Sequence, residues 1–110
     1  MRKTKINIDN KEYTLAMNRN SIKWLESRNF SVDNFLTKPL TYYDILWASL
    51  FLVYHPEINL EKAIELLDNY EKSGKKAHQY IKFAIDEYNS FINALADISS
   101  KENELEIIED

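Results

Sequence analysis

The chain has 110 residues, a length that favours one domain around one hydrophobic core. It contains no cysteine, which excludes a disulfide framework, a thiolate metal site and a cysteine nucleophile. A formal net charge of −4 argues against nucleic acid as a partner, because phosphate backbones bind clustered Lys and Arg. Glycine occurs once, so we expect long helices joined by short connections rather than a turn-rich β-fold.

Alternating apolar residues predict a β-hairpin over residues 4–16. The alternating side chains are those of Ile6, Ile8, Tyr13 and Leu15. Asp9 and Asn10 lie between the two runs and tolerate left-handed backbone angles, so they are expected to form the turn. A two-stranded hairpin is marginally stable alone in water, so its apolar face is expected to pack on helices or to join the sheet of another subunit.

Two short helices are expected next. Asn20 or Ser21 is placed to cap the first helix, which carries Trp24. Ser31 is placed to cap the second, which must end before Pro39 because the residue preceding a proline disfavours helical angles.

The most apolar segment, YYDILWASLFLVYHP, covers residues 42–56 and predicts a central helix. Thr41 and Asp44 resemble a capping box at its start, and Pro56 is expected to end it. Its apolar residues cover nearly the whole helix circumference, so we expect Trp47 to be buried.

The C-terminal half predicts two more helices and a tail. Asn59 is placed to cap a helix that stops at Gly74, the only glycine. Helical spacing then continues over residues 77–98. Residues 100–110 are acidic and lack this spacing, so they are expected to form a disordered tail.

These elements define a fold class that is mainly α with a small N-terminal β-hairpin (α+β). We expect a compact bundle of four to five helices. The hairpin at 4–16 and a helical body at 20–98 are expected to form a single domain over residues 1–99.

No pattern of catalytic or metal-binding residues is found, so no catalytic, metal or cofactor-binding residue is predicted. His55 and His78 have no carboxylate at metal-ligand spacing. A single glycine cannot build a phosphate-binding loop. No signal peptide and no run of about 18 apolar residues is present, so a membrane span is not expected.

A protein-binding function is therefore the leading hypothesis. The candidate partner-binding residues are three aromatic residues, Trp24, Phe30 and Tyr80, and three apolar residues of the tail, Leu105, Ile107 and Ile108. The tail alternates acidic and apolar groups as linear docking segments do, and a purely solubilising tail is the alternative.

One region resembles a known family. The hairpin sequence KINIDNKEYTLAMN, followed by DILWASLFLVYHPEINLEKAIELLD, is similar to the small tail assembly chaperones of long-tailed bacteriophages of Gram-positive hosts. The similarity covers roughly residues 4–70 and consists of packing and capping residues.

The resemblance implies a non-enzymatic chaperone that binds the tape measure protein during tail morphogenesis. Such a protein acts in the cytoplasm of the bacterial host and is absent from the mature virion. The tail tube protein is a further implied partner, and self-association is compatible with the unpaired hairpin. Two alternatives stay open: a small phage or mobile-element protein that inhibits a host protein, and a minor structural subunit of the tail.

Overall fold

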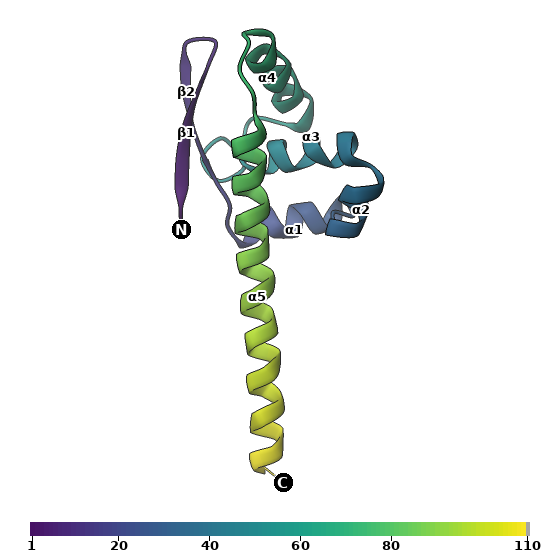
Figure 1. Cartoon of the computed structure of the whole chain (residues 1–110). Helices are drawn as coiled ribbons and strands as arrows, with labels where there is room; N and C mark the ends of the chain where they lie inside the picture. Colours follow the sequence, from purple (N-terminus) through teal and green to yellow (C-terminus); the bar gives the residue numbers. More distant parts are fainter. Residues whose placement is uncertain (110) are drawn as a thin grey trace.

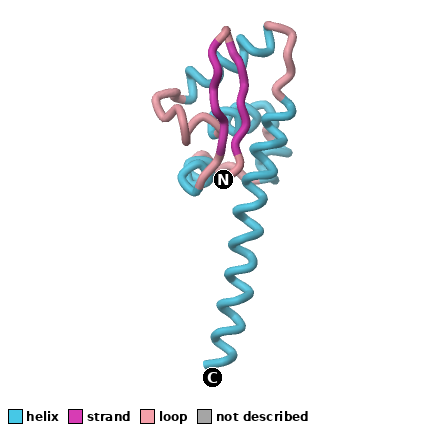
Figure 2. The backbone as a smooth tube through the Cα atoms, turned by 90° about the vertical axis from the view of Figure 1, so that its left-hand side faces the viewer, coloured by secondary structure: helices cyan, strands magenta, loops and turns pink. Residues whose placement is uncertain are grey.

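The computed structural model describes the backbone of residues 1–109 and the side chains of residues 1–95. Over this part of the chain, one antiparallel hairpin precedes five helices, which confirms the predicted α+β class (Figure 1). The strands are β1 (Lys3–Ile8) and β2 (Lys11–Ala16), and the helices are α1 (Arg19–Ser27), α2 (Val32–Thr37), α3 (Pro39–Ser49), α4 (Leu60–Lys72) and α5 (His78–Glu109). Figure 2 looks onto the outer face of the hairpin, with the helices behind it.

The hairpin forms where the sequence predicts it. Asp9 and Asn10 have φ angles of 53° and 64°, so both turn residues are left-handed, as a tight two-residue hairpin turn requires. Ile6 pairs with Tyr13 across the two strands, and both side chains are buried. The alternating apolar face therefore packs on the helical body, which is one of the two expected arrangements.

Both edges of the hairpin contact the rest of the chain. Along β2, the backbone N–H of Thr14 donates a hydrogen bond to Nε2 of His55 at 3.1 Å. Along β1, the hydroxyl of Tyr80 donates to the carbonyl oxygen of Lys5 at 3.3 Å. Because strand edges with unpaired backbone groups invite pairing with other chains, these contacts protect a two-stranded sheet.

Helix α1 begins earlier than predicted. Its N-cap is Asn18, not Asn20 or Ser21: Oδ1 of Asn18 accepts from the N–H of Ser21, and Oγ of Ser21 accepts from the N–H of Asn18, each at 3.1 Å. The pair forms a capping box in which Ser replaces the usual Glu or Gln. The missed signal is the spacing of three residues between Asn18 and Ser21.

The end of α1 turns Phe30 into the core. Asn29 has a φ of 61°, and the N–H of Phe30 donates to the carbonyl of Leu25 at 3.0 Å. This is a Schellman motif with Asn in the left-handed position, and it typically places an apolar residue against the last helical turn. Phe30 and Leu25 are accordingly both buried.

Ser31 caps α2 as predicted, whereas the bounds of α3 differ from the prediction. Pro39 occupies the first turn of α3, where its missing N–H is tolerated, so the predicted capping box from Thr41 to Asp44 is wrong. The helix also ends at Ser49 instead of continuing to Pro56.

The early end of α3 connects it to the hairpin. The carbonyl of Leu50 accepts a hydrogen bond from the N–H of Ala16 at 3.1 Å, instead of one from a following helical turn. Residues 50–54 form turns, and within them Leu50 and Phe51 still have no exposed surface. The apolar run therefore marks the core correctly, although only its first part is helical.

Trp47 lies at the centre of that core. Its side chain is fully buried, as predicted, and its Nε1 donates to the carbonyl of Ala63 at 2.7 Å. Its ring packs edge-on against Phe51 at 5.3 Å and Tyr80 at 6.4 Å between ring centres. One side chain thus joins α3 to α4 and α5.

Helix α4 matches the prediction, with Asn59 as N-cap and Gly74 at a φ of 90° just after its end. Helix α5 begins at His78, and its C-terminal bound is Glu109 rather than a residue near 98. The backbone of the predicted disordered tail, residues 100–110, is thus helical as far as Glu109, and the tail's side chains lie outside the described residues.

Candidate functional site

A groove opens between α2, the first turns of α3, α4 and the start of α5, with a volume of about 540 Å³. Its lining residues are Phe35, Pro39, Leu40, Tyr43, Asp44, Leu67, Asp68, Glu71 and His78. One wall is apolar and is supplied by α2 and the first turn of α3. The other wall is acidic and is supplied mostly by α4.

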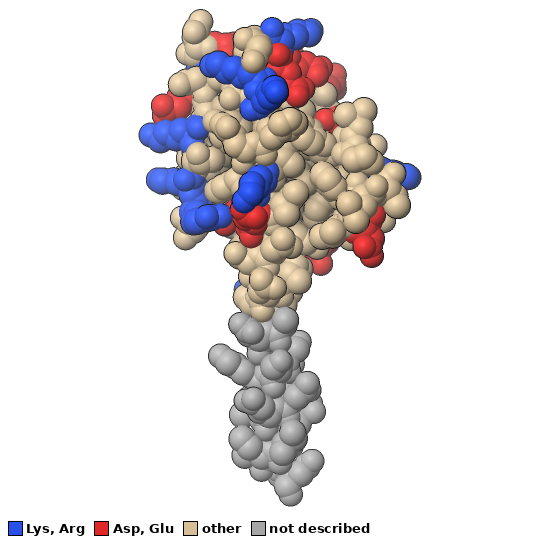
Figure 3. Space-filling model, in the orientation of Figure 1, with Lys and Arg blue, Asp and Glu red and all other residues tan. Residues whose placement is uncertain are grey.

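The apolar wall continues onto exposed surface. Val32, Leu36 and Leu40 are 50%, 72% and 77% exposed. Val32 and Leu36 are four residues apart on α2, so they share one helix face. Figure 3 shows a broad area free of charged side chains over α2 and α3, on the right of the view. We call these three residues the exposed apolar cluster.

Local structure explains this exposure. Helix α2 has only six residues, and none of them is buried. Ser31 fixes its start, because Oγ of Ser31 accepts from the N–H of Asn34 at 3.0 Å. Pro39 then begins a new helix, so the chain bends between Leu36 and Leu40. Although Phe35 of this short helix packs against the core, Leu36 next to it stays exposed.

The acidic wall carries charge that the described residues do not neutralise. Burial raises the pKa of Asp44 above its ordinary value, and the neighbouring carboxylates of Asp68 and Glu71 raise this pKa further. Among the side chains of residues 1–95, no Lys, Arg or His forms an ion pair with these three acids.

Tyr43 and His78 lie between the two walls. Burial raises the pKa of the Tyr43 hydroxyl, and the charges of Glu71 and Asp44 add to the effect. The hydroxyl is 3.4 Å from Nδ1 of His78, a long contact in which either group could donate. The floor of the groove is therefore polar, within reach of water, and negative in potential.

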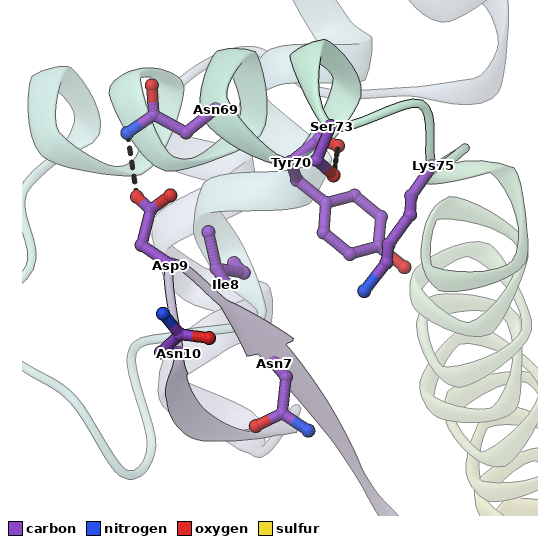
Figure 4. A pocket seen from close by; sticks show the side chains of 8 residues that line it. All are labelled: Asn7, Ile8, Asp9, Asn10, Asn69, Tyr70, Ser73 and Lys75. Carbon is purple, nitrogen blue, oxygen red and sulfur yellow. Dashed lines mark hydrogen bonds between the residues drawn. The ribbon is translucent and has the colours of Figure 1, made fainter.

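A second hollow, of about 510 Å³, lies at the tip of the hairpin beside α4 (Figure 4). Its polar groups contact one another: Nδ2 of Asn69 donates to Oδ2 of Asp9 at 2.9 Å, and Oγ of Ser73 donates to the carbonyl of Tyr70 at 2.6 Å. The Nζ of Lys75 stands 5.7 Å from the centre of the Tyr70 ring. The hydrogen bond between Asn69 and Asp9 fastens the hairpin turn to α4, and we interpret all three contacts as structural.

A third, smaller hollow of about 210 Å³ lies between α1 and α5. Ile22, Phe91 and Leu95 form its apolar part, with Arg19 and Lys23 at its rim. It is less than half the size of the groove beside α2, although Leu95, 58% exposed, adds apolar surface to it. The groove is therefore the stronger candidate for a binding site.

The structure does not bring the predicted aromatic residues together at this groove. Trp24 is half-buried on α1, where the guanidinium carbon of Arg28 lies 4.8 Å from its ring centre. Phe30 is only 6% exposed and packs on Tyr42 and Tyr88, so the exposure expected for it is not observed. The Schellman motif at the end of α1 directs the Phe30 ring inward, so Phe30 is buried and not exposed.

Tyr80 is half-buried, and its hydroxyl donates a hydrogen bond to the carbonyl oxygen of Lys5 in β1. The candidates Leu105, Ile107 and Ile108 lie outside the residues whose side chains are described. Sequence reasoning missed Leu36, Leu40 and the acids beside them. The available signal was a leucine on each side of Pro39, next to a helix too short to bury both.

The remaining side chains bear on metal binding, catalysis and membrane insertion. Within residues 1–95, no three His, Asp or Glu side chains stand close enough together to hold a metal ion. Glu61 and Glu65 on α4 are exposed. Over the described part of the chain, no helix combines the length and apolar character needed to cross a membrane.

Comparison with known proteins places the chain in a family. No curated protein and no solved structure matches it significantly. A family model described as a domain of unknown function (DUF5055) matches residues 1–108, which is almost the whole chain. The chain, with its hairpin and the five helices over the described residues, therefore belongs to the DUF5055 family.

Proposed function

We propose that this protein is a non-enzymatic binding module that holds an amphipathic helix of a larger protein. The observation that carries the proposal is the exposed apolar cluster beside the groove, where Leu36 and Leu40 are each more than 70% exposed. Exposed apolar surface next to a hollow is typical of a site that another protein covers. Short helices with an open face commonly bind an amphipathic helix in this way.

The proposed partner is the tape measure protein of a long-tailed phage, with the tail tube protein as a further candidate. This part rests on the resemblance of residues 4–70 to tail assembly chaperones. A very long helical protein exposes apolar stripes until tail subunits surround it, so a chaperone must cover those stripes reversibly. A shallow, open groove suits reversible binding, since modest affinity permits release.

The chemistry of the groove favours binding over catalysis. Its titratable side chains are carboxylates, a tyrosine and a histidine; Asp68, Glu71 and His78 are exposed, and Tyr43 and Asp44 are half-buried. Asp68 and Glu71 are exposed, and neither is positioned by a hydrogen bond to a second side chain among the described residues. General acid or base catalysis usually depends on such positioning.

Co-expression tests the proposal. We take the proposed partner, the tape measure protein, to be a long helical protein encoded downstream of this chain. It is expected to become soluble when it is produced together with this chain, and to co-purify with it. A double variant, Leu36→Ser with Leu40→Ser, should lose this effect while keeping the wild-type melting temperature. Tyr54→Ser is the matched control, because Tyr54 is 42% exposed and lies in the turns after α3, outside the groove.

Two results would contradict the proposal. The first is a downstream protein that is equally insoluble with and without wild-type chain. The second is a Leu36→Ser, Leu40→Ser variant that solubilises the protein as well as the wild type does. A stable complex with one host protein instead would favour the inhibitor alternative.

A further inference from the structure

We propose that the groove selects amphipathic helices that carry Lys or Arg along the edge facing α4. The inference rests on the proposed function, because it names the chemistry of the helix that the same groove would bind. It follows from the different character of the two walls and from the charges on one of them.

The apolar wall fixes which face of a bound helix points inward. Phe35, Pro39 and Leu40 line it, and Leu36, the residue after Phe35, is 72% exposed. A helix lying along this wall would bury residues spaced at i, i+3, i+4 and i+7, as amphipathic helices in grooves do. The 540 Å³ hollow accommodates side chains of such a stripe, while the helix backbone stays above it.

The acidic wall then determines which charge is favoured on the edge of a bound helix that faces α4. Asp68 and Glu71 are three residues apart on α4, so they project from the same face. Asp44 lies opposite them on α3, half-buried. The charges of Asp68 and Glu71 help to raise the pKa of Asp44, so the three carboxylates form a site where an added cation lowers the energy. Elsewhere on α4, Glu65 forms an ion pair with Lys62 at 3.5 Å.

Among residues 1–95, no Lys or Arg forms an ion pair with this wall. Within the described residues, none of the ion pairs within 4 Å includes Asp44, Asp68 or Glu71. His78 lines the groove and is exposed, but it is a cation only when protonated. A neutral or acidic helix would therefore desolvate the carboxylates without compensation, whereas Lys or Arg would offset that loss.

Two synthetic peptides test the inference on the full-length protein. Each is an amphipathic helix of about 18 residues, long enough for roughly five turns, with the same leucine stripe. One carries Lys along a single edge of the stripe, and its twin carries Glu at the same positions. Fluorescence anisotropy at low salt should show the Lys peptide binding roughly tenfold tighter or more.

Variants locate the source of the preference. Asp68→Asn with Glu71→Gln should reduce the affinity for the Lys peptide by roughly threefold to tenfold and bring the two peptides closer together. Glu61→Gln with Glu65→Gln is the matched control, since it removes the same charge from α4 outside the groove. The control should change the affinity for either peptide by less than about twofold.

The outcomes separate the charge preference from the binding function. Equal affinity for both peptides, with both weakened by Leu40→Ser, would overturn the charge preference and leave the groove as a binding site. A lost preference in the control variant would place the charge effect elsewhere on the surface. No binding of either peptide at accessible concentrations would overturn the preference and count against the proposed function as well.

Discussion

Leucine side chains at the two ends of α3 have opposite surroundings. Leu46 has no exposed surface and lies among the core residues around Trp47, whereas Leu40, on the first turn of the same helix, is 77% exposed. The residue type and the helix are the same, so hydrophobicity alone does not decide burial. The second half of α3 is buried in the core, whereas residues 39–41 and α2 include no buried side chain.

The largest expected effect concerns the centre of the core. Trp47→Ala should destabilise the protein by about 3 to 5 kcal/mol, because it removes a fully buried ring and leaves the Ala63 carbonyl without its donor. Against a total stability of about 5 to 15 kcal/mol, this variant should be largely or partly unfolded. Urea denaturation followed by circular dichroism measures the loss. An unchanged midpoint would show that Trp47 is not central to the core.

A matched pair of leucine variants tests the difference between the two ends of α3. Leu46→Ala should cost about 2 to 5 kcal/mol, since it opens a cavity, and Leu40→Ala should cost less than about 0.5 kcal/mol. Both substitutions remove the same atoms from the same helix, so helix propensity does not distinguish them. Comparable losses for the two variants would mean that the start of α3 is packed against the body.

His55 is expected to contribute less than these core residues. His55→Phe keeps an aromatic ring beside Tyr13, at 5.2 Å between ring centres, but removes the acceptor for the Thr14 N–H. The unfolding free energy should fall by about 1 to 2 kcal/mol, the typical effect of an unsatisfied backbone group. His78→Phe is the control and should change it by less than about 0.5 kcal/mol, because His78 is exposed. Thermal unfolding of both variants measures the difference.

The smallest expected effect is a gain in stability at the acidic wall. The folded-state pKa of Asp44 is raised, so the folded protein binds a proton more readily than the unfolded chain does. Stability therefore falls as pH rises through the interval between the unfolded and folded pKa values, and it stays lower at neutral pH. Asp44→Asn should raise the melting temperature by about 1 to 3 °C at neutral pH.

The same variant should show no gain at a pH below the ordinary aspartate range, where Asp44 is protonated in both states. Melting curves across this pH range provide the test. A lower melting temperature at neutral pH would show that the Asp44 carboxylate is favourably paired, contrary to the negative potential described for the groove.

Much of the fold could be predicted from local patterns. The turn at Asp9-Asn10, the caps Ser31 and Asn59 and the stop at Gly74 depend on neighbouring residues only, and all four are confirmed. The end of α3 could not be predicted in this way. It depends on the Ala16 N–H, which comes from a strand far away in the sequence and takes the Leu50 carbonyl.

The candidate site was harder to predict than the fold. An aromatic residue such as Phe30 is an equally good candidate for an interface or a core, and its direction is decided by the left-handed Asn29. Leu36 and Leu40 give the opposite case, because leucine is most often buried. Their exposure follows from the shortness of α2 and the bend at Pro39, which become clear only when the helices are packed.

Hydrogen–deuterium exchange of the free protein and of its complex with the downstream helical protein tests most directly whether the groove is the binding site. Helix α2 has no buried residue, so its amides should exchange rapidly in the free protein. Complex formation should slow exchange in residues 32–43 and 67–71 and leave the hairpin unchanged. Protection confined to the hairpin or to α1 and α5, with α2 exchanging as in the free protein, would contradict the proposed site.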